Sequence, residues 1–366
     1  MIRCLMALVC LPALLLTLSA SALDSDPVEP SSAEPARLAH KGLVLDVVRA
    51  GQRYVAVGER GHVLISSNGR DWEQADHVPV QATLTRVAYA DGRLWAVGHD
   101  TAIIYSRDLG QTWEIQYFEP EWQRPLLDVH FFDADNGLAI GAYGLYMRTS
   151  DGGRSWEDHE MADLITSEAI DWEEAAEQAE AYDDTADTLE AIGEDPDDFD
   201  DYYDAETDFD RGCYEFLECH LNAFEVIDGD RFMIVAERGY GFRSTDAGET
   251  WESFRFPYPG SMFGLISLND RGILAFGLRG NVQLSTDFGD SWEVLDSGLD
   301  SSLMGGTRGP DGRALMVGVG SARLFYDPAS GRFRLNEDRL GSDFAAAIFD
   351  ADGRLILAGE DGLSHE

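Results

Sequence analysis

The sequence predicts an all-β protein, a seven-bladed β-propeller with an acidic insertion between its third and fourth blades. Three observations carry this prediction. A four-residue turn recurs at a nearly constant interval, a second motif rich in Ser, Asp, Gly and Trp recurs with it, and each interval holds four short apolar segments. Repeats of this length with four strands each are typical of propeller blades.

The recurring turn begins with Gly or Ala and in most copies ends with Gly. Successive copies begin 40, 43, 95, 41, 41 and 41 residues apart. The one long interval equals a normal period plus an insertion of about 53 residues, so the chain holds seven units. The turns are residues 58–61, 98–101, 141–144, 236–239, 277–280, 318–321 and 359–362.

The second motif reads Ser/Thr-x-Asp-x-Gly-x-Ser/Thr-Trp, and we call it the Asp box. Its Ser and Asp side chains can hydrogen-bond the amides of their own turn, its Gly supplies a positive φ, and its Trp can bury a large ring against the neighbouring sheet. The same polar residues would also suit a calcium or catalytic site, but the turn itself uses them all, so we predict a structural role. The complete copies contain Asp108 and Trp113, Asp151 and Trp156, Asp246 and Trp251, and Asp287 and Trp292.

The seventh unit ends before a fourth strand forms. We expect the propeller to occupy residues 39–366 and the preceding segment, residues 23–38, to close it. In this interpretation residues 34–41 supply the outermost strand of the seventh blade, which removes an exposed sheet edge.

The N-terminal residues and the cysteines both point to export. Residues 1–22 carry one positive charge at Arg3, an apolar run and a small-residue cleavage site, the pattern of a secretory signal peptide. We therefore expect an exported, periplasmic protein in which Cys213 and Cys219 form a disulfide. Together with His220 these cysteines would alternatively form part of a metal site, but no fourth ligand is clustered with them, so we expect neither a metal nor a cofactor.

The insertion, residues 161–218, is strongly acidic. Residues 163–210 contain 21 Asp or Glu and no Lys or Arg. Apolar residues from Ile165 to Leu189 recur at spacings of three and four, which predicts an acidic helix that starts at Thr166 or Ser167 and stops at Gly193. The following residues lack this pattern, and we expect a solvated loop there rather than a calcium site.

The formal net charge of −41 excludes some classes of partner. Nucleic acid and anionic membrane surfaces would be repelled by such a chain. No later stretch approaches the roughly 18 apolar residues that would span a bilayer, so we expect no direct membrane insertion. We also expect a monomer.

The order of strands decides which loops share a face. The turns between the second and third strands and the connections between blades should lie on one face, which we call the top face, and the Asp boxes on the other, the underside. The top face would then present Arg60, His99, Tyr143, Arg238 and Arg279 as candidate partner-binding residues. Guanidinium groups suit bidentate binding of carboxylates. The alternative is that the arginines pair with neighbours such as Glu59 and Glu237.

Unit sequences such as YVAVGERGHVLISSNGRDW and LLDVHFFDADNGLAIGAYGLYMRTSDGGRSW resemble the photosystem II stability/assembly factor family of Asp-box (BNR) propellers. The resemblance covers nearly all of residues 39–366 outside the insertion. It implies a non-enzymatic factor that binds an integral membrane protein, or a subunit of a membrane complex, during assembly. It also implies an arginine-rich binding surface, for which it suggests Arg60, Arg238 and Arg279.

Two other functions compete with this one. Asp boxes also mark sialidase-like glycoside hydrolases, and residues 254–257, Phe-Arg-Phe-Pro, resemble the Phe-Arg-Ile-Pro motif of that family. The motif follows the fourth box here, whereas it precedes the first box in sialidases. The third possibility, a receptor for a peptide or a sugar, would use the same top face as the assembly factor.

Overall fold

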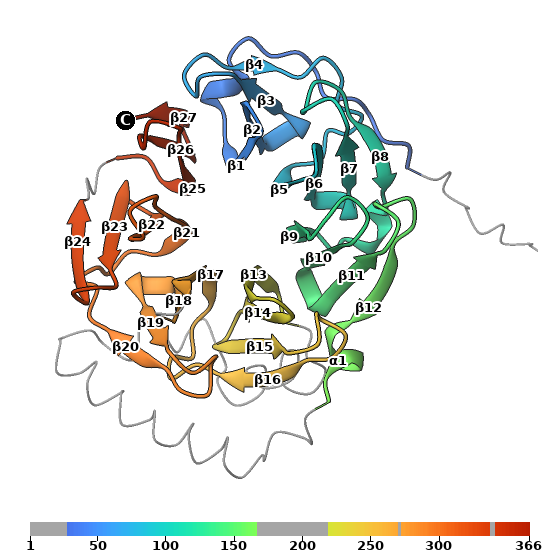
Figure 1. The fold of residues 1–366 in the computed structure, drawn as a ribbon. Helices are drawn as coiled ribbons and strands as arrows, with labels where there is room; N and C mark the ends of the chain where they lie inside the picture. The colour runs from blue at the N-terminus through green and yellow to red at the C-terminus, as the bar shows by residue number, and fades with distance from the viewer. Residues whose placement is uncertain (1–27, 167–218, 270–271, 337–340) are drawn as a thin grey trace, which may run out of the picture.

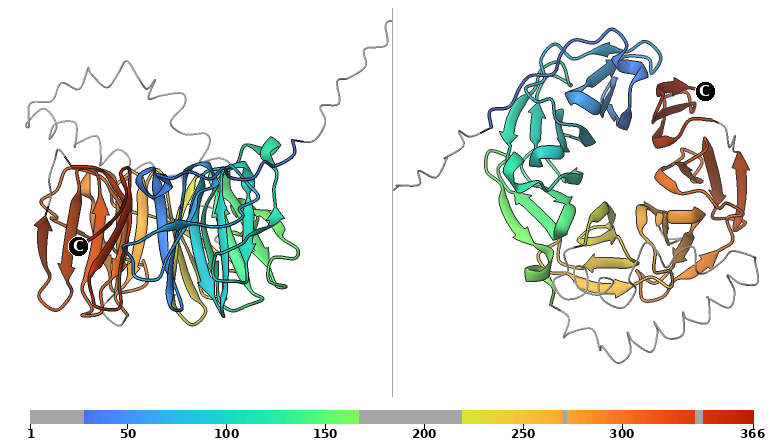
Figure 2. Two further views of the ribbon diagram at one scale, coloured as in Figure 1. Left: turned by 90° about the horizontal axis from the view of Figure 1, so that it is seen from above. Right: turned by 180° about the vertical axis from the view of Figure 1, so that it is seen from behind.

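The structure, a computed structural model, describes residues 28–166, 219–269, 272–336 and 341–366 of the chain. The strands in these residues form seven antiparallel sheets arranged as a ring (Figure 1). Seen edge-on, the ring is a disc whose strands run between two flat faces (Figure 2). The seven-bladed propeller predicted from the repeats is confirmed.

The strands follow one another from the centre of the ring outwards in every blade. Blade 1 holds β1 (Val44–Ala50), β2 (Arg53–Gly58), β3 (Val63–Ser66) and β4 (Glu73–Gln74), and blade 2 holds β5 (Leu84–Ala90), β6 (Arg93–Gly98), β7 (Ile103–Ser106) and β8 (Glu114–Tyr117). Blade 3 holds β9 (Leu126–Phe131), β10 (Gly137–Gly141), β11 (Leu145–Thr149) and β12 (Glu157–Glu160), and blade 4 holds β13 (Leu221–Asp228), β14 (Arg231–Ala236), β15 (Tyr240–Ser244) and β16 (Glu252–Arg255).

The remaining blades follow the same plan. Blade 5 holds β17 (Met262–Ser267), β18 (Ile273–Gly277), β19 (Val282–Ser285) and β20 (Glu293–Leu295), and blade 6 holds β21 (Leu303–Arg308), β22 (Ala314–Gly318), β23 (Ala322–Asp327) and β24 (Arg332–Asn336). Blade 7 holds β25 (Phe344–Phe349), β26 (Leu355–Gly359) and β27 (Gly362–His365). The one α-helix in the described residues is α1 (Met161–Leu164), and short 3₁₀ helices lie at Ala39–Lys41, Glu59–Gly61, His99–Thr101, Pro120–Trp122, Ala142–Gly144 and Leu278–Gly280.

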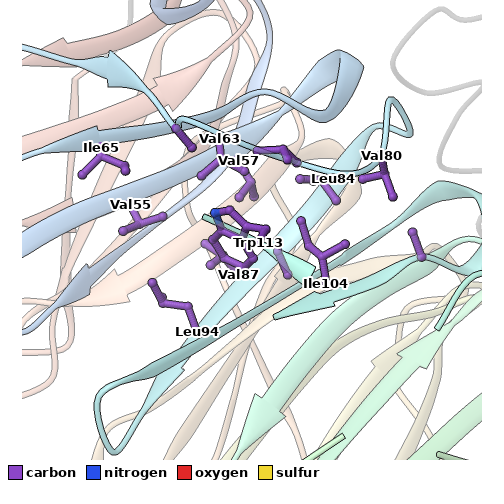
Figure 3. Close-up of a cluster of buried hydrophobic side chains, with 14 of the residues drawn as sticks. Val55, Val57, Val63, Ile65, Val80, Leu84, Val87, Leu94, Ile104 and Trp113 are labelled. Carbon is purple, nitrogen blue, oxygen red and sulfur yellow. The ribbon is translucent and has the colours of Figure 1, made fainter. Parts of the chain in front are cut away.

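The hydrophobic core is divided into clusters between neighbouring blades. In the cluster between blades 1 and 2, Trp113 of the Asp box is 1% exposed and packs among Val55, Val57, Leu94 and Ile104 (Figure 3). A buried tryptophan removes a large apolar area from water, so each box aromatic stabilises the contact of its own blade with the preceding one.

Each complete Asp box is bonded within itself. Asp108 accepts hydrogen bonds from Thr112 N (2.9 Å), Thr112 Oγ1 (2.6 Å) and Ser106 Oγ (2.8 Å). Gly110 N donates to Ser106 Oγ at 3.0 Å, and Trp113 Nε1 donates to the Gly110 carbonyl at 2.9 Å. The Ser and Asp side chains therefore meet their hydrogen-bonding needs inside the turn, and in this box the indole N–H of Trp113 is bonded there as well.

The seventh blade is not completed as expected. It has three strands in the described residues, whereas each of the other six has four. The N-terminal segment lies along blade 1 instead, where Ala33 N donates to the Val78 carbonyl at 2.9 Å and Ala36 N donates to Gln74 Oε1 at 2.8 Å. Ala33 also packs against the core between blades 1 and 2. The expectation that residues 34–41 form the outermost strand of blade 7 is therefore wrong.

The central channel is lined by the first strand of each blade, as the sequence predicts (Figure 1). Carboxylates on three of these strands accept a backbone N–H of the next blade, and so join neighbouring blades around the channel. The pairs are Asp46 with Val87 N (2.9 Å), Asp128 with Phe224 N (2.9 Å) and Glu225 with Ser267 N (3.1 Å).

Burial changes the pKa values of two of these carboxylates. Burial raises the pKa of Asp46 to about 6, although the nearby Arg86 guanidinium lowers it, and burial raises the pKa of Glu225 to about 7. Arg86 lies between two acids, with Nη1 3.7 Å from Asp46 and Nε 3.1 Å from Asp128. Ionised Glu225 has no such cation in an ion pair within the described residues.

The insertion is anchored at both ends to the contact between blades 3 and 4. Trp251 N donates to the Leu164 carbonyl at 2.9 Å, and Ile165 forms an isolated β-bridge with Trp251. At the other end, Gly144 N donates to the carbonyl of buried Cys219 at 2.8 Å. Cys219 is disulfide-bonded. Its expected partner Cys213 and the expected helix up to Gly193 lie outside the described residues and stay predictions.

Changing Glu225 to Gln should alter how stability depends on pH. The carboxyl has a pKa of about 7 in the folded protein and 4.5 in the unfolded chain, so between these values the folded state holds a proton that the unfolded chain has released. Its contribution is full below about pH 4.5 and is lost as the pH rises through 7. We expect wild type to lose about 3 kcal/mol relative to the variant between pH 4.5 and about pH 8, measured by urea unfolding.

The matched control for this experiment is Glu360→Gln, which removes an exposed carboxyl from the turn of blade 7. Both variants remove one acidic group from the unfolded chain, so an effect of charge repulsion in the unfolded chain appears in both. If the free energy of unfolding depended on pH in the same way for Glu225→Gln and Glu360→Gln, the raised pKa of Glu225 in the channel would be contradicted.

Deletion of residues 28–38 should weaken the fold without opening the ring. The deletion removes the packing of Ala33 and the two hydrogen bonds above, which together are worth about 2 kcal/mol. A deletion that continues through Lys41 should cost more, because it also removes buried Ala39 and the His40 carbonyl that meets the turn of blade 7. Thermal unfolding compares the two deletions. An equal loss of stability in both would contradict the assigned contact between residues 39–41 and blade 7.

Candidate functional site

In five of the seven blades the turn of the top face holds a third residue other than glycine in the left-handed conformation. Its φ is 57° at Arg60, 60° at Asp100, 56° at Tyr143, 56° at Arg238 and 53° at Arg279. Residues other than glycine adopt this conformation uncommonly, at a cost of about 1–2 kcal/mol. We call this residue the turn tip. Because these five tips are not glycine, their side chains invite a functional interpretation.

The fourth residue of the turn is glycine because the next connection between blades lies against it. A Cβ atom at Gly61 would lie 2.0 Å from the Val80 carbonyl oxygen, and one at Gly280 would lie 2.1 Å from that of Leu299. Blades 2 and 6 depart from the pattern: the Thr101 hydroxyl donates to the Arg124 carbonyl at 2.8 Å, and the Ser321 hydroxyl donates to the Ser342 carbonyl at 2.9 Å. The turns and the connections thus share one face, as the strand order predicts.

The ring order decides which tips are neighbours. From blade 1 to blade 7 the tips are Arg60, Asp100, Tyr143, Arg238, Arg279, Gly320 and Asp361. Blades 3, 4 and 5 are consecutive in the ring, so Tyr143, Arg238 and Arg279 form one arc, which we call the tip arc (Figure 1). Arg60 is separated from this arc by Asp100 on one side and by blades 6 and 7 on the other. The three arginines therefore do not form a single clamp.

One predicted site residue is displaced from the tip. His99 is exposed on the top face but precedes the tip of blade 2, and the tip itself is Asp100. The tip of blade 2 is therefore acidic and interrupts the row of basic tips.

Tyr143 is held in place by residues from two blades. It is 48% exposed, and its ring meets the His220 ring edge-on with 4.9 Å between centroids. Arg124 donates to the Tyr143 carbonyl at 2.5 Å and binds both carboxylate oxygens of Glu160, at 2.7 and 2.6 Å. A bidentate pair of this kind fixes orientation as well as supplying energy.

His220 also connects the tip arc to Glu237. Its Nδ1 lies 3.1 Å from Glu237 Oε2, and its backbone N donates to Glu237 Oε1 at 3.1 Å. Burial acts to raise the pKa of Glu237, but the hydrogen bonds from His220 outweigh it and hold the pKa below the usual range. Glu237 is therefore ionised, and it has His220 as a bonded partner. From the sequence alone, Glu237 is an alternative ion-pair partner of the neighbouring Arg238.

The arginine tips border shallow depressions. Arg279 lines one of about 400 Å³ together with Asn281, exposed Val294, Asp296 and Asp300. Arg60 lines another, of about 390 Å³, with Gln81, His62 and residues 34–36 of the N-terminal segment. Arg60 is exposed and forms no ion pair with another described residue, Glu59 included. A guanidinium in this setting is available to a partner's carboxylate.

The hydrolase alternative finds no support in the position of its motif. Arg255 lies on the outermost strand of blade 4, with its guanidinium carbon 4.1 Å from the centroid of the Tyr240 ring, and Phe256 is buried. Within the described residues no group of three or more His, Cys, Asp or Glu is placed to hold a metal ion. Helices long and apolar enough to span a bilayer are absent from the same part of the chain.

Three residues of the site escaped the sequence prediction. Asp100 can be found from the sequence, because in every unit the tip lies two residues after the first residue of the turn, which is Gly98 in blade 2. Arg124 and His220 have none, because their roles depend on the connections of blades 2–3 and 3–4 folding back over the turn of blade 3.

Sequence comparison finds a curated relative, whereas no family model matches the chain. The photosystem II stability/assembly factor HCF136 of Arabidopsis thaliana is 30% identical over 119 residues. The match covers 31% of this chain and 29% of that protein, so the aligned part spans under a third of the relative.

Comparison of structures extends the likeness over the ring. YCF48 from Cyanidioschyzon merolae matches with a TM-score of 0.61 and 14% identity over 91% of this chain and 97% of that one. A structure of YCF48 bound to D1 peptide matches with a TM-score of 0.61 and 16% identity over 95% and 98%. The WD40 propeller domain of Doa1 gives the same TM-score, so these structural matches show the fold alone. With the sequence match, the resemblance predicted from the repeats is confirmed.

The strain at a turn tip can be measured at Arg60. Arg60→Gly should be at least as stable as wild type, whereas Arg60→Val should lose about 1–2 kcal/mol, because a β-branched side chain is poorly accommodated at positive φ. Urea unfolding provides the measurement. Arg49, exposed on strand β1, is the matched control, where Val should be better tolerated than Gly. The same order of stability at both positions would contradict a left-handed tip.

Proposed function

From its likeness to photosystem II stability/assembly factors, we propose that this chain is a non-enzymatic assembly propeller that binds a subunit of an integral membrane complex. The tip arc of Tyr143, Arg238 and Arg279 on the top face carries the contact. One observation supports this most strongly. Three consecutive blades hold large polar side chains at their turn tips in a conformation that costs energy and that glycine would adopt freely.

The chemistry of the tip arc suits an extended peptide that carries acidic groups. Arginine binds carboxylates through two parallel hydrogen bonds, and tyrosine offers a rigid ring with a polar end. Arg279 and Tyr143 are exposed, and Arg238 between them is partly buried. A segment lying across blades 3 to 5 would therefore meet an aromatic ring, a cation and a second cation in turn.

The related proteins support the same class of partner. One similar structure is described as YCF48 bound to D1 peptide, and the similar curated protein is named an assembly factor. Both names describe those proteins. For this chain we propose a membrane-protein subunit of the same general kind, without assigning it to a photosystem.

We also propose that the protein is exported, with residues 1–22 removed as a signal peptide. Its charge pattern and the disulfide-bonded Cys219 support an oxidising compartment outside the cytoplasm. A mature protein that begins at Leu23, found by N-terminal sequencing of the periplasmic fraction, would agree with this. An intact Met1 terminus in the cytoplasm would contradict it.

Photo-crosslinking in cells tests the proposed contact. A photoreactive phenylalanine analogue at position 143 should capture a membrane protein, and the same analogue at Thr286 in the Asp box of blade 5 should not. Replacing Arg238 and Arg279 together by Gly should reduce capture about 100-fold, since each charge-assisted contact is worth about 1.5 kcal/mol. Glycine is chosen because it accepts the positive φ of the tip and keeps the turn folded.

Arg60→Gly is the matched control, because it removes an equivalent tip from a blade outside the tip arc. We expect it to keep most of the capture. Capture that survives loss of both arc arginines, or that occurs equally from position 286, would contradict the proposed face.

A further inference from the structure

A cavity of about 710 Å³ lies on the underside of the ring, between blades 3 and 4. Its walls are the hairpins that join the first two strands of these blades, parts of their Asp boxes and the outer strand β12. It is larger than the depressions beside Arg60 and Arg279, and its volume is typical of ligand pockets. It lies on the opposite face from the tip arc.

Phe132 places an aromatic ring at this cavity. The ring stacks on the Phe232 ring, with 4.9 Å between centroids and 11° between planes, and it meets the Phe224 ring edge-on at 6.3 Å. Phe224 and Phe232 are buried, whereas Phe132 is 40% exposed. Buried neighbours therefore hold the ring of Phe132 in one orientation, and it still offers apolar surface to a ligand.

The fold does not require an exposed aromatic residue at this position. A hairpin hydrogen bond from a backbone N–H to the carbonyl four residues on recurs in blades 3, 5, 6 and 7. Its donors are Phe132, Leu268, Gly309 and Asp350, at 2.9, 2.8, 2.7 and 2.7 Å. The leucine is only 1% exposed. A hairpin with this bond thus accepts a buried leucine, a glycine or an aspartate, so the exposed ring is a property of the cavity rather than of the repeat.

Carboxylates line the same cavity as this ring. They belong to Asp133, Glu157 and Asp230, and the last two are exposed. A hydrogen bond from the Asn136 side chain lowers the pKa of Asp133, so this carboxylate stays ionised at neutral pH. His159 also lines the cavity and carries charge only when it is protonated. At neutral pH the cavity therefore holds negative charge beside an aromatic ring.

Arg148, which also lines the cavity, is bound by a carboxylate of the neighbouring blade. Its Nη1 lies 2.8 Å from Glu249 Oε1, a contact that joins the walls formed by blades 3 and 4. The two charges offset each other. The excess charge of the cavity is therefore that of Asp133, Glu157 and Asp230.

We propose that this cavity binds a basic segment of a second protein partner, with an arginine or lysine as its central residue. The aliphatic stem of that residue lies on the Phe132 ring, and its charge meets the carboxylates of Glu157 and Asp230. Long basic side chains combine an apolar stem with a charged end, and an aromatic ring attracts the cation itself. The protein then joins two partners through opposite faces of one ring.

The charge of the chain favours a basic occupant. A formal net charge of −41 attracts a basic segment and repels an acidic one, and this attraction acts over roughly 10 Å at physiological salt. A second copy of this chain carries the same charge and is therefore a poor occupant. The cavity is bordered by two hairpins and two Asp boxes, which is more surface than one basic side chain covers. A peptide segment thus fits better than a free amine.

Two synthetic peptides test the site, the basic acetyl-ARARA-amide and the acidic acetyl-AEAEA-amide. In calorimetry with the purified protein, we expect the basic peptide to bind saturably at one site. Its affinity should fall about tenfold between roughly 0.05 and 0.5 M salt. N-acetylarginine amide, the free-amine control, should bind about tenfold more weakly than the basic peptide. Absence of binding by the basic peptide, saturable binding of the acidic one, or equal binding of arginine amide would overturn the proposal.

Substitutions taken from the other blades test the ring. Phe132→Gly gives blade 3 the residue of blade 6, and we expect it to weaken binding of the basic peptide about fourfold, the worth of an exposed cation–π contact. Phe132→Leu gives it the residue of blade 5 and keeps most of the apolar surface, so the loss should be about twofold. Thermal unfolding shows whether each variant is folded, and the leucine variant carries the test if the glycine variant is not. Wild-type affinity in the folded variants would rule out this site.

Paired substitutions test the charges. Glu157→Gln/Asp230→Asn should weaken binding of the basic peptide about fivefold, because two exposed ion pairs are lost. The matched control is Glu73→Gln/Asp76→Asn, which removes two exposed carboxylates from blade 1. It should leave the affinity within about twofold, because salt screens distant charges. An equal loss in both pairs would show that the peptide follows the overall charge rather than the cavity, which contradicts the proposal.

Photo-crosslinking separates this surface from the tip arc. In permeabilised cells, p-benzoylphenylalanine at position 132 should capture a protein whose crosslinked segment contains Arg or Lys, and the basic peptide should compete with the capture. The Arg238→Gly/Arg279→Gly variant should keep this capture, and Phe132→Gly should keep the capture from position 143. A crosslinked segment that is acidic, or that comes from a second copy of this chain, would refute the proposed occupant. Loss of the capture at position 132 together with the two arc arginines would refute a separate surface.

Discussion

The structure depends on the close approach between each blade's middle turn and the chain that connects to the next blade. The contact leaves no room for a side chain at the end of the turn, because a Cβ atom at Gly61, Gly239 or Gly280 would lie only 2.0–2.4 Å from a neighbouring carbonyl oxygen. At Gly61, Gly239 and Gly280 the residue that precedes the glycine is in the left-handed conformation. At Gly362 the same contact, with His40, joins the last blade to the first.

That constraint gives the two faces different capacities for binding. On the underside, the Asp boxes use their polar groups internally, and hydrogen bonds from Ser291 lower the pKa of Asp287 to about 2. On the top face the side chains of Arg60, Tyr143 and Arg279 are exposed at the turn tips. The polar groups that stabilise the Asp boxes therefore lie on the opposite face from these exposed tip residues.

Much of the fold follows from the repeat, because a four-stranded unit of this size buries its apolar faces only against neighbouring copies. The period therefore fixes the number of blades and the two faces. His99 lies exposed in the turn of blade 2, but the tip of that turn is the next residue, Asp100, which the alignment of residues 98–101 with the other turns already identifies. The grouping of Tyr143, Arg238 and Arg279 apart from Arg60 needs only the ring order, which the sequence does contain.

The course of the N-terminal segment lay beyond sequence reasoning. Pairing with an open strand edge uses backbone groups that every residue possesses, so residues 34–41 carried no signal that distinguished blade 7 from blade 1. The segment is held along blade 1 by the packing of Ala33 in the core between blades 1 and 2 and by hydrogen bonds to Gln74, Val78 and Gln81. The roles of Arg124 and His220 likewise depend on how two connections fold over a turn.

The central claim is that the tip arc is the surface that meets the membrane-protein partner. Hydrogen exchange of the purified complex, compared with the protein alone, measures this most directly. The account predicts slowed exchange in the turns at Ala142–Gly144 and Leu278–Gly280 and in the turn that contains Arg238. Protection confined to the Asp boxes of the underside, with those turns unchanged, would contradict it.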